Sequence, residues 1–343
     1  MCVYRPWVEG PAGARRTHNS HSSEPASSGR SAQAVKSIRI RVPASVANLG
    51  PGFDTLALAL DLHNELTVEV IDADLDFEVE GEGKGQLPTD ASNLIAQAAY
   101  RLFQTVGTRP PGMRIRSNNH IPLGSGLGSS AAAIVAGLMA ADAIAESGMS
   151  REQLLEIAWE LEGHADNAAA VLFGGLTIVG QASGSLMTTK IPIAPMRLAV
   201  VTPEIEMPTE RMRDALPQEV PLRDAALNLG RMALMLEALR HGDFELLSRA
   251  SEDCLHEPYR IPLIPGCSEA RLAGLEAGAA AITLAGAGPG LIAFAPDRHE
   301  AIAEAMANVY SSYDYPVRKF VLNPEPQGAR LLLTAHSDEP GRD

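Results

Sequence analysis

Residues 122–132 read Pro-Leu-Gly-Ser-Gly-Leu-Gly-Ser-Ser-Ala-Ala and join a predicted strand (113–116) to a predicted alanine-rich helix (129–147). Gly124, Gly126 and Gly128 let the backbone take positive φ values and approach a ligand closely. A helix N-terminus adds unpaired N–H groups and a partial positive charge. Together these features predict an anion site suited to phosphate. The alternative is a tight structural turn, in which Ser129 and Ser130 serve only to cap the helix.

This loop does not follow either of the two common nucleotide-binding patterns. A P-loop carries a lysine before its final Ser or Thr, and no lysine follows these glycines. The chain has only four lysines, at Lys36, Lys84, Lys190 and Lys319. The glycine spacing also differs from the G-x-G-x-x-G of dinucleotide enzymes. Any nucleotide chemistry here must therefore neutralise phosphate with Mg²⁺, the helix N-terminus or arginine.

Composition excludes several classes of protein. The 343 residues include 42 Asp and Glu against 28 Lys and Arg, a net charge of −14. Nucleic acid and anionic membranes need a concentrated cationic face, so neither is an expected partner. Three cysteines without a C-x-x-C pair exclude a disulfide framework. The apolar runs are too short to span a membrane, and we expect a cytoplasmic protein.

The order of predicted elements favours a two-domain α+β fold over a doubly wound sheet, because strands and helices alternate in runs rather than in strict βα repeats. Thr89 or Asp90 can cap a helix that runs to about residue 106. A proline-rich passage at 191–203 is a plausible domain boundary. We predict four parts: a disordered extension at 1–36, domains at 37–195 and 196–324, and a loose tail at 325–343.

Two further segments contain polar residues that packing does not explain. One is Pro-Ala-Ser-Val-Ala-Asn-Leu-Gly-Pro-Gly-Phe-Asp at 43–54, where Asn48 and Asp54 flank a stiff loop that could aim both at a small ligand. The other is Glu-Gly-His-Ala-Asp-Asn at 162–167, where Glu162 and Asp166 could share a metal and His164 could donate to a substrate. The alternatives are a structural turn with Asp54 as a cap, and a polar surface cap at 162–167.

These three segments together resemble the GHMP kinases, the superfamily of galactokinase, homoserine kinase, mevalonate kinase and phosphomevalonate kinase. The motifs P-x-x-x-G-L-G-S-S-A-A, A-N-L-G-P-G-F-D and E-G-H-x-D-N, in combination, are most similar to the homoserine kinase family. The resemblance runs from about residue 38 to 321. It implies an N-terminal, ATP-binding domain like ribosomal protein S5 and a ferredoxin-like C-terminal domain.

The resemblance also implies a set of ligands and contacts. ATP would be the co-substrate, with Mg²⁺ at Ser130 and Glu162, both hard oxygen ligands. L-Homoserine would be phosphorylated on its side-chain hydroxyl, a step of threonine biosynthesis. The family's ATP contacts match Pro122, Gly124, Ser125, Gly126, Leu127, Gly128, Ser129 and Ser130. Its contacts to the amino-acid substrate match Asn48, Asp54, His164, Arg213 and Arg260.

Around the reacting hydroxyl, the resemblance implies roles for His164, Asn167 and Thr209. Related mevalonate kinases place an aspartate base near the position of Asn167. Because an amide cannot take a proton, we expect catalysis by positioning and charge stabilisation, which a loose phosphoryl-transfer transition state permits. Asp166 as a conventional base is the alternative.

The sequence departs from the homoserine kinase pattern beside several of these contacts, at Ser45, Val46, Ala165, Ala168, Ala170, Ala285 and Gly290. A paralogue acting on another small hydroxy amino acid or alcohol therefore stays open, as does a catalytically silent ligand-binding regulator. The resemblance is also compatible with a homodimer.

Overall fold

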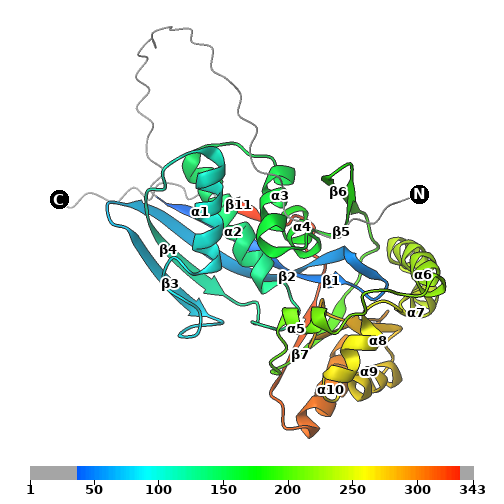
Figure 1. Ribbon diagram of the computed structural model, residues 1–343. Coiled ribbons are helices and arrows are strands. Elements are labelled where there is room, and N and C mark those ends of the chain that lie inside the picture. The colour runs from blue at the N-terminus through cyan, green and yellow to red at the C-terminus, as the bar shows by residue number, and fades with distance from the viewer. Residues whose placement is uncertain (1–36, 333–343) are drawn as a thin grey trace. The chain divides into compact units, whose positions relative to one another are not determined.

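The computed structural model describes residues 37–332 (Figure 1). The predicted disorder of residues 1–36 and the last eleven residues of the predicted tail lie outside this range. Within it, two β-sheets are each covered by helices, so the α+β prediction is confirmed. The predicted boundary near residue 195 falls where the chain leaves the first sheet for the second, and it remains a prediction.

The first sheet has seven strands, in the order β11-β1-β2-β4-β3, with β5 and β6 extending from β2. Its longest strand, β2, pairs with β1 on one edge and with β4 and then β5 on the other. All pairings are antiparallel except β3 with β4. The strands are β1 (Ile38–Asn48), β2 (Gly52–Ile71), β3 (Leu75–Gly81), β4 (Gly112–Asn119), β5 (Leu176–Ala182), β6 (Ser185–Ile191) and β11 (Arg330–Leu332).

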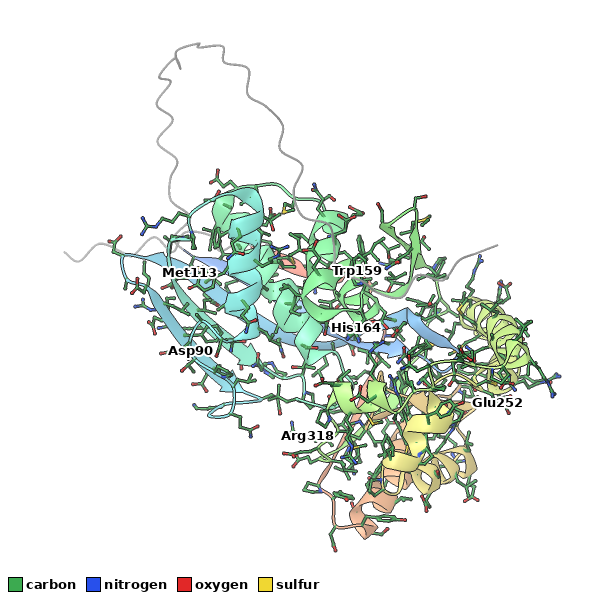
Figure 2. The ribbon with its side chains drawn as sticks, viewed as in Figure 1. Asp90, Met113, Trp159, His164, Glu252 and Arg318 are labelled. Carbon is green, nitrogen blue, oxygen red and sulfur yellow. The ribbon has the colours of Figure 1, made fainter. Side chains whose placement is uncertain are left out.

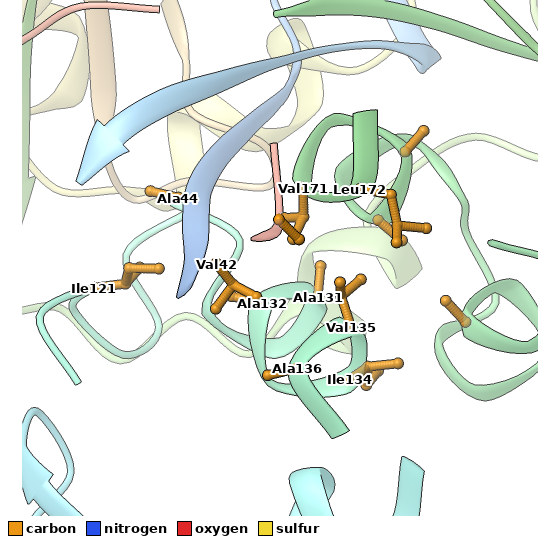
Figure 3. Close-up of a cluster of buried hydrophobic side chains, with 14 of the residues drawn as sticks. Val42, Ala44, Ile121, Ala131, Ala132, Ile134, Val135, Ala136, Val171 and Leu172 are labelled. Carbon is orange, nitrogen blue, oxygen red and sulfur yellow. The ribbon is translucent and has the colours of Figure 1, made fainter. Parts of the chain in front are cut away.

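Four helices cover one face of this sheet: α1 (Leu94–Val106), α2 (Ser129–Ala145), α3 (Arg151–Glu162) and α4 (Asp166–Phe173) (Figure 1). The alanine-rich α2 lies at the centre, where its small side chains pack against Val42 of β1 and Val171 of α4 (Figure 3). At Gly137, an added Cβ would lie 2.2 Å from the carbonyl oxygen of Ile95, so α1 and α2 touch backbone to backbone. This packing fixes the position of α2, and with it the N-terminus of the helix, against the central strands of the sheet.

The start of α1 differs from the prediction. The capping residue is Asn93, whose side chain accepts a hydrogen bond from the N–H of Ile95. Asp90 instead accepts hydrogen bonds from Ser92 in the preceding turn. Asx side chains close turns as readily as they cap helices, so the first acidic candidate was not the cap.

The second sheet has the order β10-β7-β9-β8 and is antiparallel throughout. Its strands are β7 (Leu198–Pro203), β8 (Ala281–Leu284), β9 (Leu291–Phe294) and β10 (Val317–Leu322). The helices of this half are α5 (Thr209–Asp214), α6 (Leu222–His241), α7 (Phe244–Ala250), α8 (Glu257–Arg260), α9 (Cys267–Glu276) and α10 (His299–Ser312), with a 3₁₀ turn at Ile261–Leu263.

The prediction of a loose tail from residue 325 is wrong for residues 325–332. Arg330–Leu332 pairs with β1, and the backbone N–H of Glu325 donates to the carbonyl of Ala59. The Glu325 carboxylate is buried, 2.8 Å from Nε2 of His63. Proline and charge suggested disorder, but here the charged groups find buried partners in the first sheet.

Candidate active site

A cavity of about 510 Å³ contains most of the predicted site residues. Its walls come from the 122–130 loop, the β1–β2 turn, the segment joining α3 to α4, the helix α5, Arg260 and the 286–288 loop. The predicted residues that line it are Asn48, Asp54, Gly124, Ser125, Gly126, Gly128, Ser129, Ser130, His164, Asp166, Asn167, Thr209, Arg213 and Arg260. Pro122, Leu127 and Glu162 do not line it.

The glycine loop is shaped by close backbone contacts. Gly124, Gly126 and Gly128 have φ values of 60°, 81° and 69°. An added Cβ at Gly126 would lie 2.0 Å from the carbonyl oxygen of Ala285. Gly128 is the N-cap of α2 and makes no side-chain cap. The helix therefore begins at a left-handed glycine, and the alternative in which Ser129 and Ser130 serve only to cap the helix is wrong.

A second glycine loop, residues 285–290, supports the first. The N–H of Gly286 donates to Ala47, and its carbonyl accepts from the Asn48 side chain at 2.8 Å. A Cβ at Gly290 would lie 2.4 Å from the carbonyl oxygen of Ser125. The departure from the family pattern at Gly290 thus removes a side chain where the two loops meet.

Ser130 and Glu162 form a compact oxygen pair. The Ser130 hydroxyl donates to Oε1 of Glu162. Within residues 37–332, Oε2 of Glu162 is buried and has no hydrogen-bond partner. Burial raises the pKa of Glu162, against the opposing effects of His164 and Ser130. The same part of the chain has no cluster of three or more His, Cys, Asp or Glu side chains able to hold a metal.

His164 lies just before α4 and is paired with Asp166, the first residue of that helix. Nδ1 of His164 lies 3.3 Å from Oδ1 of Asp166, and the Asp166 side chain is almost fully buried. Burial alone would lower the pKa of His164, but the hydrogen bond to Asp166 and the charges of Glu162 and Asp166 raise it. Figure 2 shows His164 between the helices of the first sheet and the α5 region. The imidazole is therefore biased toward its cationic form.

A hydroxyl on β1 orients the side chain of Asn167. The buried hydroxyl of Ser45 donates to Oδ1 of Asn167 at 2.9 Å. The oxygen of the amide is thus engaged by Ser45, and Asn167 lines the cavity. The departure at Ser45 thus retains a hydroxyl with a definite partner.

The opposite wall of the cavity is charged. Arg213 forms two hydrogen bonds to the Asp54 carboxylate, at 2.9 and 3.1 Å. Arg260 is buried, and its Nε donates to the carbonyl of Met212. Burial, followed by the charge of Arg213, lowers the pKa of Arg260 to about 10. Both guanidinium groups lie over the Phe53 ring, at 5.9 Å for Arg213 and 5.3 Å for Arg260.

Comparison with known proteins matches this architecture. Family profiles of the GHMP kinases match residues 93–175 (N terminal domain) and 235–312 (C terminal). The homoserine kinase of Desulfitobacterium hafniense is 36% identical, covering 86% of this chain and all of its own. That of Moorella thermoacetica is 40% identical over 79% of this chain and 92% of its own.

The chain belongs to the homoserine kinase family. It is thus an ATP-dependent kinase with the two-domain GHMP fold. Among solved structures, homoserine kinase from Cytophaga hutchinsonii is 30% identical, with a TM-score of 0.79, and covers 90% of this chain and all of its own. Mevalonate kinase from L. major, at 16% identity and a TM-score of 0.67, shares the fold. In residues 37–332, no helix has the length and apolarity to cross a bilayer.

Two groups of residues at this homoserine kinase site were missed by sequence reasoning. His256 stacks on Phe53 at 5.3 Å, approaches Arg260, and hydrogen-bonds the carbonyl of Gly50. No spacing rule brings it to the site, because Phe53 and Gly50 lie about 200 positions away in the sequence. The far end of the cavity was also missed, because its residues are dispersed over strands and helix starts: Asn64, Leu66, Val79, Leu87, Asn93, Ser117 and Asn119.

Proposed function

We propose that this protein transfers the γ-phosphoryl group of ATP to the side-chain hydroxyl of L-homoserine, giving O-phospho-L-homoserine for threonine synthesis. One observation carries the proposal. A single cavity joins a glycine loop suited to phosphate with the Asp54 carboxylate and the guanidinium groups of Arg213 and Arg260. The first feature suits a nucleotide, and the second suits the ammonium and carboxylate of an amino acid.

ATP would lie along the glycine loop with its base toward the far end of the cavity. Backbone N–H groups at the start of α2 and the helix dipole favour the phosphates there. The far end combines apolar side chains, such as Leu66 and Val79, with the amides of Asn64 and Asn119. A flat aromatic base with polar edges suits such a lining.

Mg²⁺ fits the pair formed by Ser130 and Glu162. A hydroxyl and a carboxylate are hard oxygen ligands of the kind that Mg²⁺ prefers. The buried Oε2 of Glu162 lacks a hydrogen-bond partner in the described part of the chain, and an unpaired buried acceptor is costly. Held there with two protein groups, the ion would draw its other ligands from water and phosphate, and would neutralise phosphate charge.

L-Homoserine would be held by its two charged ends. Asp54 would bind the ammonium group, and Arg213 and Arg260 would bind the carboxylate as forked donors. Arg260 is positioned for this before the substrate arrives, because Met212 and His256 hold its Nε and Nη1. Thr209 lies four residues before Arg213 on α5, and both residues line the cavity.

Phosphoryl transfer would rest on positioning and charge. The Asn167 amide cannot accept a proton, but its NH₂ group can hold the hydroxyl of the substrate. Asp166 is engaged by His164 and by the N–H of Asn167 at 2.8 Å, which leaves it poorly suited to act as a free base. A cationic His164 can stabilise negative charge on the transferring group, the main requirement of a loose transition state.

The test is a substrate panel. Purified protein with Mg-ATP is assayed for ADP release with L-homoserine, L-serine and L-threonine, ranked by kcat/KM. The highest value for L-homoserine supports the proposal, and a higher value for another alcohol moves it to a paralogous kinase. Binding of L-homoserine in calorimetry without any ADP release would point instead to the silent regulator.

A further inference from the structure

The Asp54–Arg213 contact joins the two groups that the proposed function assigns to opposite charges of the substrate. It is a two-point pair in which Nη1 and Nη2 of Arg213 each donate to one carboxylate oxygen of Asp54, at 2.9 and 3.1 Å. The residues are 159 positions apart, and each side chain is about two-fifths exposed, at 39% and 42%. Each group is therefore satisfied by the other.

Arg260 behaves differently, although it lies beside the same ring. Its side chain is buried, and its Nε and Nη1 are held by Met212 and His256. No carboxylate of the described residues pairs with it. Asp54, Arg213 and Arg260 together carry one net positive charge, which is located at Arg260.

We propose that Asp54 and Arg213 each substitute, within the protein, for the opposite charge of the substrate. Only a zwitterion can replace both partners when the pair opens. The inference rests on the proposed function. On binding, the substrate carboxylate joins Arg213 and Arg260, while the ammonium group takes Asp54. One ion pair within the protein is exchanged for two with the ligand, so neither protein group is left unpaired.

Ligands with one charge cannot complete this exchange. A carboxylate without an amine, such as 4-hydroxybutyrate, either binds Arg260 alone or withdraws Arg213 and leaves Asp54 unpaired. An amine without a carboxylate, such as 3-amino-1-propanol, takes Asp54 and leaves two neighbouring guanidinium groups without an anion. Leaving a charged partner unpaired is more costly than never forming the pair. The pair therefore selects amino acids over simple hydroxy acids and amino alcohols.

The test uses isothermal titration calorimetry on the full chain with Mg²⁺ and a non-hydrolysable ATP analogue. L-Homoserine and 4-hydroxybutyrate are the probes, with Asp54→Asn, Arg213→Gln and the double variant. Asn tolerates the left-handed backbone of Asp54, whose φ is 49°. Glu300→Gln is the matched control, because it removes one acid from another exposed pair, with Arg197 at 2.8 Å.

The decisive readout is the binding of 4-hydroxybutyrate. Asp54→Asn frees Arg213, so this anion should bind about tenfold more tightly than to the wild type, as expected for one additional charged hydrogen bond. The double variant removes the pair as a unit, so its Kd for 4-hydroxybutyrate should stay within about threefold of the wild type. L-Homoserine should bind the double variant at least about a hundredfold more weakly, because two charged contacts are lost. Glu300→Gln should leave both affinities unchanged.

Two results would overturn the inference while leaving the proposed function intact. One is that 4-hydroxybutyrate binds the Asp54→Asn variant no more tightly than the wild type, or that it shows no detectable binding to the variant. The other is that the double variant binds 4-hydroxybutyrate tenfold more weakly than the wild type does. That result would mean that Arg213 already contacts this anion in the wild type. Failure of L-homoserine to bind or react with the wild-type protein would remove the proposed function, and the inference with it.

Discussion

The two ends of the cavity are built in opposite ways. At the nucleotide end, the binding surface is backbone, and two glycines of the 122–130 loop, Gly126 and Gly128, are fixed by contacts with Ala285 and Ser45. At the amino-acid end, the surface is charged side chains from distant segments, and two of them, Asp54 and Arg213, satisfy each other. The first end is ready for phosphate before it arrives. The second must exchange partners, which makes it the more selective end.

Arg260 offers the largest test of this difference. Replacing it in Arg260→Met removes a buried guanidinium that the proposed substrate carboxylate would need. We expect kcat/KM for L-homoserine to fall about a thousandfold, equivalent to about 4 kcal/mol, since truncating a buried charged partner costs about 2–5 kcal/mol. The KM for ATP should change less than about threefold, because the loss is confined to one end. Steady-state kinetics with each substrate varied in turn measures both.

Arg211→Met is the matched control for this variant. Arg211 lies on the exposed part of α5, one residue before Met212, and it does not line the cavity. The same chemical change there should leave both KM values near the wild-type values. Equal losses for ATP and L-homoserine in Arg260→Met would contradict a division of the cavity into two independent ends.

The second test addresses the rigidity of the nucleotide end. Gly126→Ala places a Cβ 2.0 Å from the Ala285 carbonyl oxygen at a positive φ, whereas a Cβ at Gly124 meets no described atom within 4 Å. We expect Gly126→Ala to lower the free energy of unfolding by about 3 kcal/mol or more, from clash and strain together. Gly124→Ala should cost about 1 kcal/mol, for strain alone. Urea unfolding without nucleotide gives both values, and equal losses would show that the loop contact is not rigid.

The third test concerns how stability depends on pH at Glu257, which supports the 285–290 loop at the nucleotide end. Oε1 of Glu257 accepts the N–H of Leu284, just before the 285–290 loop. Burial raises the pKa of Glu257 to about 7, against the opposing charge of Arg271. An unfolded glutamate titrates near 4.3. The folded protein therefore holds a proton that the unfolded chain releases between these values, and stability is lost as the pH rises through about 7.

The Glu257→Gln variant isolates this contribution. Its amide oxygen can still accept from Leu284, but it cannot titrate. Subtracting the free energies of unfolding of wild type and variant cancels the other titrating groups. The difference should change by about 2 kcal/mol between pH 5 and pH 7, in favour of the wild type at the acidic end. A difference that stays constant over this range would mean that Glu257 keeps an ordinary pKa.

The contrast between the ends also explains what the sequence could predict. The glycine loop could be predicted from its own residues, because short-range backbone geometry determines it. Ser130 and Glu162 were brought together only by the resemblance to the family. No spacing in the sequence predicts the Asp54–Arg213 contact, because it depends on how α5 approaches the β1–β2 turn. For the same reason, sequence reasoning missed His256, and it expected a loose tail where Glu325 pairs with His63. Long-range pairing decides these features, and local composition does not report it.

Ser45 provides the smallest test and the most specific one, because it touches both ends. Its hydroxyl donates to Oδ1 of Asn167, and it lies 2.1 Å from where a Cβ of Gly128 would be. Ser45→Ala leaves the two ends in place but frees the Asn167 amide to rotate. We expect kcat to fall about tenfold, the value of about one hydrogen bond, with both KM values within about twofold. Ser45→Thr keeps the hydroxyl and should retain kcat. A changed KM with an unchanged kcat would assign Ser45 to packing of the glycine loop, and would leave the orientation of Asn167 to other contacts.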